Sequence, residues 1–258
     1  MKNAFSSLGK PTLITIIWFI GFLVANICGV FVPLAMKIPV KSAQGILLAT
    51  GSMAILMVGF SLLLNRWYAK AKIYSKLTGI FKSYLTDIFY IIYLTSIMMI
   101  IFEHKAHNLG LSFLTAFAVA ASEELIIRGI ILGKVLEIWK GTHKIWAAII
   151  ISSIFFAIIH LINALHQPLS ATIIQVAYTF FMGMILAIVY LKTGTLLSAI
   201  LFHGLIDTYG FIQTNSFNVV NSQGNWTTVG ICAVMSLFFI ISILRKGQMD
   251  RIKTNFKI

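Results

Sequence analysis

The chain has 258 residues, of which 59% are hydrophobic and only 10% are charged. A soluble domain is nearer half apolar and a quarter charged, so this composition excludes a water-soluble globule. The net charge of +13 would suggest a nucleic-acid partner in a soluble protein, but in a membrane protein Lys and Arg gather at cytoplasmic helix ends. We therefore expect no nucleic-acid binding. Cys28 and Cys232 lie in apolar runs and predict neither a disulfide nor a metal site.

Recurring apolar runs of about 20 residues predict a polytopic, all-α membrane protein with eight transmembrane helices. The first run is too long for a secretory signal, whose apolar part has about 7–15 residues. Gly194 marks a tight turn between the sixth and seventh helices. In chain order the eight helices are Thr12–Leu34, Gly45–Leu64, Tyr84–Phe102, Leu111–Leu132, Ile145–Leu161, Thr172–Leu191, Thr195–Ile212 and Val229–Leu244.

Two polar connections complete the predicted organisation. The segment Arg66–Tyr84 mixes basic and aromatic residues, and it fits an amphipathic helix on the cytoplasmic leaflet and a plain basic loop equally well. The stretch Gln213–Thr228 is rich in Asn, Ser, Gln and Gly and predicts an external loop. No sequence repeat divides the chain, so we expect residues 1–258 to form one integral membrane domain.

The distribution of Lys and Arg predicts how the helices are oriented. One alternate set of loops and chain ends holds 16 of these residues, and the other set holds only Lys37, Lys41 and Lys105. Because cytoplasmic loops carry the excess of Lys and Arg, we expect both termini in the cytoplasm. An even number of spans is consistent with that orientation.

Six ionisable residues of the predicted helices gather on three of them. A charged side chain near a helix centre costs about 2.5–3.5 kcal/mol, so several together would cost on the order of 10 kcal/mol, comparable with the stability of a domain. Such groups are retained where they pair around a wet, functional cavity. They lie on the fourth, fifth and seventh helices and are Glu123, Glu124, Arg128, His160, His203 and Asp207.

On the fourth helix, spacing gives the two adjacent glutamates different predicted roles. Glu124 and Arg128 are four residues apart, so they lie on one face and can form a buried ion pair. Glu123 is turned about 100° away and is the candidate general base. The alternative is that all three residues form a purely structural network.

The fifth and seventh helices each contribute a histidine. Phe156 lies one turn before His160, which taken alone would more often be a core histidine than a ligand. His203 and Asp207 are four residues apart, so they can share a metal ion, or the carboxylate can orient the ring. A carboxylate base and two imidazoles are what peptide-bond hydrolysis needs. Two versions stay open: His160, His203 and Asp207 bind Zn²⁺, or Glu123 activates water alone and the histidines stabilise the oxyanion.

The three strings Glu-Glu-x-x-x-Arg, Phe-x-x-x-His and His-x-x-x-Asp, in this order on three helices, resemble the CPBP (Abi) family of intramembrane proteases, which includes CAAX prenyl endopeptidases and bacteriocin-processing enzymes. The family core would cover about residues 111–212. The resemblance implies an endopeptidase acting on a membrane-associated peptide or protein, with a cavity open to the cytoplasm and, in a bacterium, a place in the cell membrane. It implies catalytic roles for Glu123, His160 and His203, and supporting roles for the remaining matched residues Glu124, Arg128, Phe156 and Asp207.

One residue departs from the family pattern. Prenyl endopeptidases carry Asn at the position of Asp207, and an ionised aspartate cannot donate to an oxyanion as an amide can. Asp207 is therefore expected to orient His203 or to bind a metal.

Two other classes of function are weighed against the protease. A non-catalytic bacteriocin-immunity or scaffold protein of the same fold would tolerate single changes of the three catalytic residues. A transporter or proton pathway also uses buried acids and histidines, but the sequence has neither the inverted repeat nor the mid-span proline breaks common in transporters.

Overall fold

The computed structural model describes residues 9–75, 109–141, 143–165, 167–213, 225–245 and 247–258. Within these ranges the protein is all-helical, and six helices are long and apolar enough to cross a membrane. The chain is thus a multi-pass membrane protein. The six spans are α2 (Gly9–Ala35); α3 (Ala43–Leu64) with the π-helical turn η1 (Asn65–Ala69); α6 (Leu109–Glu124) with η2 (Leu125–Leu132) and α7 (Gly133–Ile138); α8 (Lys144–Ile159) with η3 (His160–Leu165); α9 (Leu169–Thr193); and α11 (Trp226–Leu244).

The predicted eight helices are recovered in part. Seven of them fall on described residues and each is helical, while Tyr84–Phe102 lies outside the described residues. The predicted seventh helix is α10 (Leu196–Gln213), whose apolar stretch is shorter than those of the six spans. The predicted end of the fourth helix at Leu132 is wrong, because the helix continues through η2 and α7 to Ile138.

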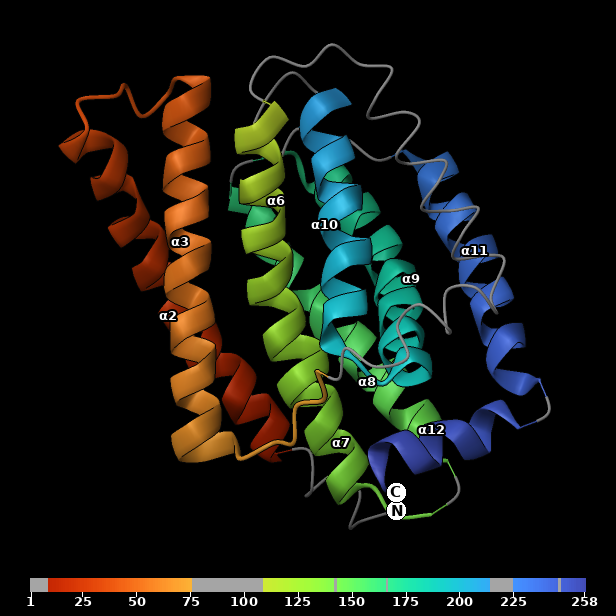
Figure 1. Ribbon diagram of the computed structural model, residues 1–258. Helices are drawn as coiled ribbons and strands as arrows, with labels where there is room; N and C mark the ends of the chain where they lie inside the picture. Colours follow the sequence, from red (N-terminus) through yellow and green to blue (C-terminus); the bar gives the residue numbers. More distant parts are fainter. Residues whose placement is uncertain (1–8, 76–108, 142, 166, 214–224, 246) are drawn as a thin grey trace.

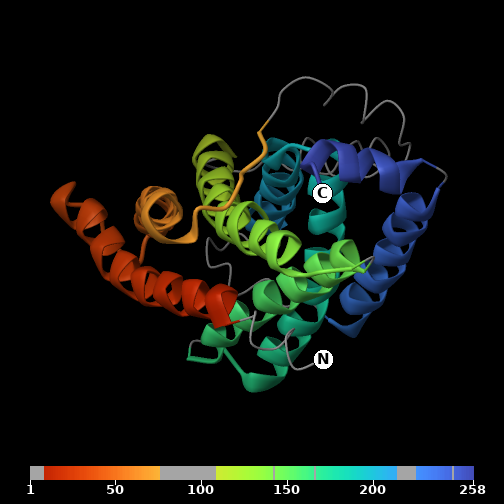
Figure 2. The ribbon, with the colours of Figure 1, turned by 90° about the horizontal axis from the view of Figure 1, so that it is seen from below.

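The helices form a bundle in which neighbours in space are not always neighbours in sequence (Figure 1). From one side to the other, α2 packs on α3, α3 on α6, and α6 on α10, while α9 packs on α8, α10 and α11. Viewed from below, α2 and α11 lie at opposite edges of the bundle (Figure 2). The contact between α6 and α10 brings the glutamates of one helix beside the histidine of the other.

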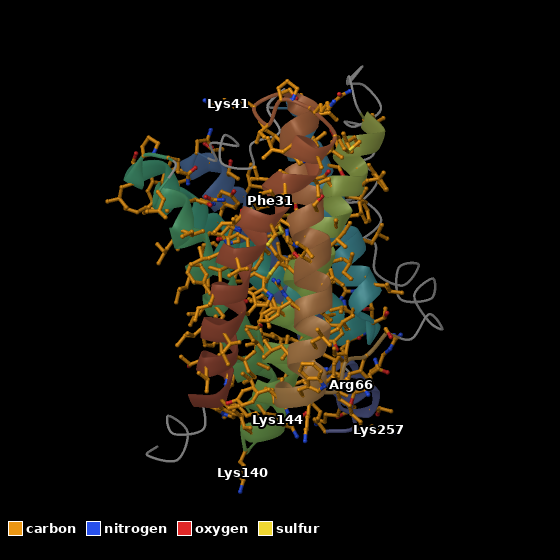
Figure 3. The ribbon with its side chains drawn as sticks, turned by 90° about the vertical axis from the view of Figure 1, so that its left-hand side faces the viewer. Phe31, Lys41, Arg66, Lys140, Lys144 and Lys257 are labelled. Carbon is orange, nitrogen blue, oxygen red and sulfur yellow. The ribbon has the colours of Figure 1, made fainter. Side chains whose placement is uncertain are left out.

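The two ends of the bundle differ in how many of the labelled basic side chains they carry. Arg66, Lys140, Lys144 and Lys257 lie at one end, and Lys41 lies at the other (Figure 3). The start of α2 and the C-terminal helix both lie at the basic end (Figure 1). That this end faces the cytoplasm stays a prediction from the positive-inside rule.

At the basic end lies the first part of the segment Arg66–Tyr84, for which the sequence fitted an amphipathic helix and a basic loop equally well. Helix ends at Lys70, which adopts a left-handed conformation (φ 53°), and Ala71–Ser75 continues without helix. The described part of Arg66–Tyr84 is therefore not one amphipathic helix. The Tyr74 carbonyl accepts from the Leu196 backbone N–H (2.8 Å), and Ser75 pairs with Thr195 in an isolated antiparallel bridge. This segment thus satisfies the first free N–H of α10.

The short helix α12 (Gln248–Phe256) was not predicted, and it lies across the basic end (Figures 1 and 2). Its buried residues Ile252 and Phe256 are four apart, a spacing that a search for long apolar runs does not register. The predicted turn at Gly194 is confirmed, with φ 68° and a bond from its N–H to the Tyr190 carbonyl. Cys28 and Cys232 are both free cysteines.

Candidate active site

Two glutamates at the end of α6 lie in different environments. Glu124 is fully buried, and its Oε1 accepts a hydrogen bond of 2.8 Å from Nη1 of the equally buried Arg128. The side chain of Glu123 is 18% exposed and does not contact the guanidinium within ion-pair distance. The predicted pairing is therefore present, and the two carboxyl groups have separate surroundings.

Arg128 lies in the π-helical segment η2, and π-helical turns are frequent at functional sites. Its Nη2 donates to the Gly183 carbonyl of α9 at 3.2 Å, and its guanidinium carbon lies 4.3 Å from the centre of the Phe156 ring on α8. One buried cation thus holds three helices together through an ion pair, a backbone hydrogen bond and a cation–π contact.

His203 on α10 joins the two glutamates. Its Nδ1 lies 2.8 Å from Glu124 Oε1. Because the carboxylate of an ion pair can only accept, Nδ1 carries a proton and donates it to Glu124. On the other side of the ring, Nε2 lies 3.9 Å from Glu123 Oε2 and 3.5 Å from Asp207 Oδ2.

The bond between Glu124 and His203 was not anticipated from the sequence. The spacing of His203 and Asp207 suggested that Asp207 orients the ring, whereas the short hydrogen bond comes from Glu124. No local pattern contains this bond, since the two residues are 79 positions apart and meet only because α6 packs on α10. Glu124 therefore supports both Arg128 and His203.

His160 lies where α8 ends and the 3₁₀ turn η3 begins. Its Nδ1 is 2.7 Å from the Phe156 carbonyl oxygen. A carbonyl only accepts, so Nδ1 is the protonated nitrogen and Nε2 of the neutral ring is an acceptor. The Phe156 ring meets both imidazoles edge-on, with centroids 5.0 Å from His160 and 5.6 Å from His203.

All seven residues that the motifs singled out are thus linked by direct contacts into one cluster. The acid comes from α6, the first imidazole from the end of α8, and the second imidazole with Asp207 from α10. Glu124, Arg128 and Phe156 are buried and lie between them. This arrangement brings the carboxylate of Glu123 and two imidazoles, each with its proton on Nδ1, into one cluster.

Two glycines of the site were not predicted. A Cβ atom on Gly183 would lie 3.1 Å from the Ser153 backbone Cα and 3.3 Å from the Phe156 ring. A Cβ atom on Gly204, next to His203, would lie 2.9 Å from the Phe117 ring. Both positions therefore allow helices that carry site residues to approach closely. Each glycine stands in an apolar run, where its neighbours in sequence give no sign of this role.

The predicted zinc ligands were His160, His203 and Asp207. Both histidines donate from Nδ1 to an oxygen and leave Nε2 for another partner, as metal-ligating histidines commonly do. However, among the residues that the structure describes, no three His, Cys, Asp or Glu side chains are arranged to hold a metal ion. Zinc binding stays a prediction for metal analysis of the purified protein.

A family model described as "Type II CAAX prenyl endopeptidase Rce1-like" matches residues 105–209. The predicted resemblance to the CPBP family is thereby confirmed. The matched range runs from just before α6 into α10 and includes every residue of the cluster. No curated protein and no solved structure matches the chain. This match to a CAAX endopeptidase family points to an intramembrane protease with a membrane-associated substrate.

Proposed function

We propose that this protein is a glutamate-dependent intramembrane endopeptidase that hydrolyses a peptide bond of a membrane-associated peptide or protein. The observation that carries the proposal is the position of Glu123. Its carboxylate lies 3.9 Å from His203 Nε2, while the neighbouring Glu124 is engaged by Arg128 and by His203 Nδ1. Glu123 is therefore the glutamate that is placed to accept a proton from water.

The two imidazoles perform different tasks in this proposal. His203 donates from Nδ1 to Glu124, so a second proton on Nε2 would face the carboxylates of Glu123 and Asp207. Such an imidazolium is stabilised by all three carboxyl groups and can donate to an oxyanion. Neutral His160 holds its proton on Nδ1, so its Nε2 accepts a hydrogen bond from the attacking water or the leaving amine.

The reaction follows from these protonation states. Glu123 takes one proton from water while the water oxygen forms a bond to the carbonyl carbon of the substrate, and His203 Nε2–H donates to the oxyanion that develops. The C–N bond then breaks, and Glu123 passes its proton to the leaving nitrogen. The products are a carboxylic acid and an amine, and Glu123 returns to its ionised form. Asp207 acts on His203 and does not contact the oxyanion.

The setting of this activity is also proposed. The resemblance of the motifs supports a place in the cell membrane of a bacterium and a role in bacteriocin immunity or in processing of secreted peptides. The Abi-type and bacteriocin roles depend on the motifs alone, whereas the CAAX endopeptidase type is supported by the family match.

The test uses the purified protein in liposomes with two fluorogenic peptides of one sequence, one prenylated near its C-terminus and one not. We expect cleavage by the wild type and its loss in Glu123→Gln, with Asp250→Asn as control because Asp250 is 80% exposed and far along the chain in α12. Cleavage by Glu123→Gln at the wild-type rate would contradict the proposal. If the wild type cleaves neither peptide and bacteriocin protection survives in Glu123→Gln cells, the protein is a non-catalytic binder.

A further inference from the structure

Beside His160, amide side chains form a cluster that the proposed reaction does not use. His160 is the first residue of the 3₁₀ turn η3, and Asn163 lies three residues later. In a 3₁₀ helix residues three apart are eclipsed. Asn163 therefore stands in line with His160 on the same face of η3.

The side-chain oxygen of Gln175 on α9 accepts hydrogen bonds from the other two amides of this cluster. Gln175 is only 5% exposed, and its Oε1 accepts from Asn163 Nδ2 at 2.9 Å and from Gln167 Nε2 at 2.8 Å. Gln167 also donates to Thr172 Oγ1 at 3.1 Å, and its backbone N–H donates to the Asn163 carbonyl at 2.9 Å. Both lone pairs of the Gln175 oxygen are thus occupied.

The turn η3 has no fully buried apolar side chain to hold it in place. None of its described residues is buried, and Leu161 and Leu165 are 48% and 72% exposed. The His160 ring is bonded to the Phe156 carbonyl, within the same chain segment. A hydrogen bond from Asn163 to Gln175 links η3 to α9.

We infer that Gln175 is a positioning residue for His160. By fixing Asn163 and Gln167, its amide oxygen sets where α8 ends and η3 begins, and hence where His160 Nε2 points. The inference rests on the proposed function for its catalytic consequence, but the effect on the His160 ring is independent of activity. Gln175 touches none of the reacting groups, so it acts on the rate through His160 alone.

The expected kinetic effect is a loss of turnover without a loss of substrate binding. Displacing a catalytic group by about 1 Å can lower the rate on the order of 10²-fold. Gln175→Leu removes the shared acceptor and should lower kcat on the order of 10- to 100-fold, with KM nearly unchanged. Gln175→Glu keeps an oxygen that accepts from both amides and should restore most of kcat. The control is Thr179→Val, one turn further along α9, whose hydroxyl bonds only carbonyls of its own helix.

The second readout is the NMR spectrum of ring-labelled histidine, with His160 and His203 assigned through His160→Gln and His203→Gln. Gln175→Leu should shift the His160 resonance and leave that of His203 in place, whereas Gln175→Glu and Thr179→Val should leave both in place. An unchanged His160 resonance in Gln175→Leu would overturn the inference even if cleavage is abolished. A shift of both resonances together would also overturn it, since this would indicate general disruption. If the wild type proves inactive, the proposed function fails while the NMR experiment still decides the role of Gln175.

Discussion

The helices at the centre of the bundle and the pair at its edge differ in how much they bury. In the most apolar 18-residue stretch, 61% of the residues of α9 and 56% of those of the α6–α7 span are buried. For α2 and α3 the figure is 22% each. All four spans are apolar enough to cross a membrane, so hydropathy alone does not distinguish them. Buried ionisable residues do, because they are concentrated in the central group.

The edge pair, α2 and α3, shows how two spans pack without any of the candidate catalytic residues. Trp18 Nε1 donates to Ser61 Oγ at 2.9 Å between α2 and α3, and many apolar side chains of both helices face outward. The central helices instead bury an ion pair, a histidine and a backbone acceptor for arginine. The family match over residues 105–209 includes the central helices α6 to α10 and excludes the edge pair. The proposed function is therefore assigned to the central helices, which bury these polar groups.

The largest expected effect is the loss of activity on replacing Glu123, the candidate general base of the central helices. Glu123→Gln keeps the shape of the side chain but removes its basicity, and positioned general bases contribute on the order of 10²- to 10⁴-fold. We expect kcat to fall by that factor with the melting temperature nearly unchanged. A large drop in melting temperature with residual activity in the folded fraction would instead assign Glu123 a structural role.

Breaking the buried ion pair should destabilise the central helices. Arg128→Met leaves Glu124 buried without its cation, and removing one partner of a buried pair costs about 3–5 kcal/mol. Unfolding by denaturing detergent measures this loss. The double variant Arg128→Met with Glu124→Gln removes both charges and should recover part of the stability. If the double variant is less stable by the sum of the two single losses, the two residues do not act as a pair.

A pair of glycine substitutions compares close packing in the two regions. Gly183→Ala forces α8 and α9 apart at Ser153 and Phe156, and overpacking costs about 1–3 kcal/mol. Gly59→Ala on α3 meets nothing within 4 Å and should be neutral or slightly stabilising. Unfolding of both variants under the same conditions gives the comparison. Equal stability of the two would show that α8 and α9 are not in close contact at Gly183.

The smallest effect on stability is expected for a substitution on α3, at the edge of the bundle. Ile55 on α3 is 67% exposed, so Ile55→Ala leaves no internal cavity and should change the stability by no more than about 0.5 kcal/mol. Activity should stay at the wild-type level. A loss of more than about 2 kcal/mol, the size typical of a core truncation, would show that α3 is covered by protein at this face.

Much of the site could be predicted from spacing, because its parts are local on each helix. The separation of Glu124 and Arg128 by four residues predicted their ion pair, and the turn between Glu123 and Glu124 predicted their different surroundings. The contacts that could not be predicted from the sequence are those between residues of different helices. The bond of His203 to Glu124 and the carbonyl of Gly183 on Arg128 arise from contacts of α10 and α9 with α6 and η2.

The fold shows the same division. On the described residues, apolar runs located most ends of the membrane helices to within a few residues, since burial in lipid needs about 20 apolar residues whatever their neighbours. The continuation of the fourth predicted helix to Ile138 was not predicted, because Lys134 and Glu137 interrupt the apolar run. In the structure these two residues form an ion pair with each other. Helix α12 was not predicted from the sequence, because only two of its residues are buried and these do not make a long apolar run.

The central claim is that the carboxyl group of Glu123 and the ring of His203 face each other inside the bundle. Solid-state NMR of the protein in lipid, with ¹³C at the glutamate carboxyl groups and ¹⁵N in the histidine rings, measures this directly. The account predicts a dipolar contact between His203 Nε2 and Glu123, at the separation expected from the 3.9 Å N–O distance, and a second contact between Nδ1 and Glu124. The first contact should disappear from the spectrum of Glu123→Gln made with unlabelled glutamine. A contact of His203 with Glu124 alone in the wild type would contradict the account.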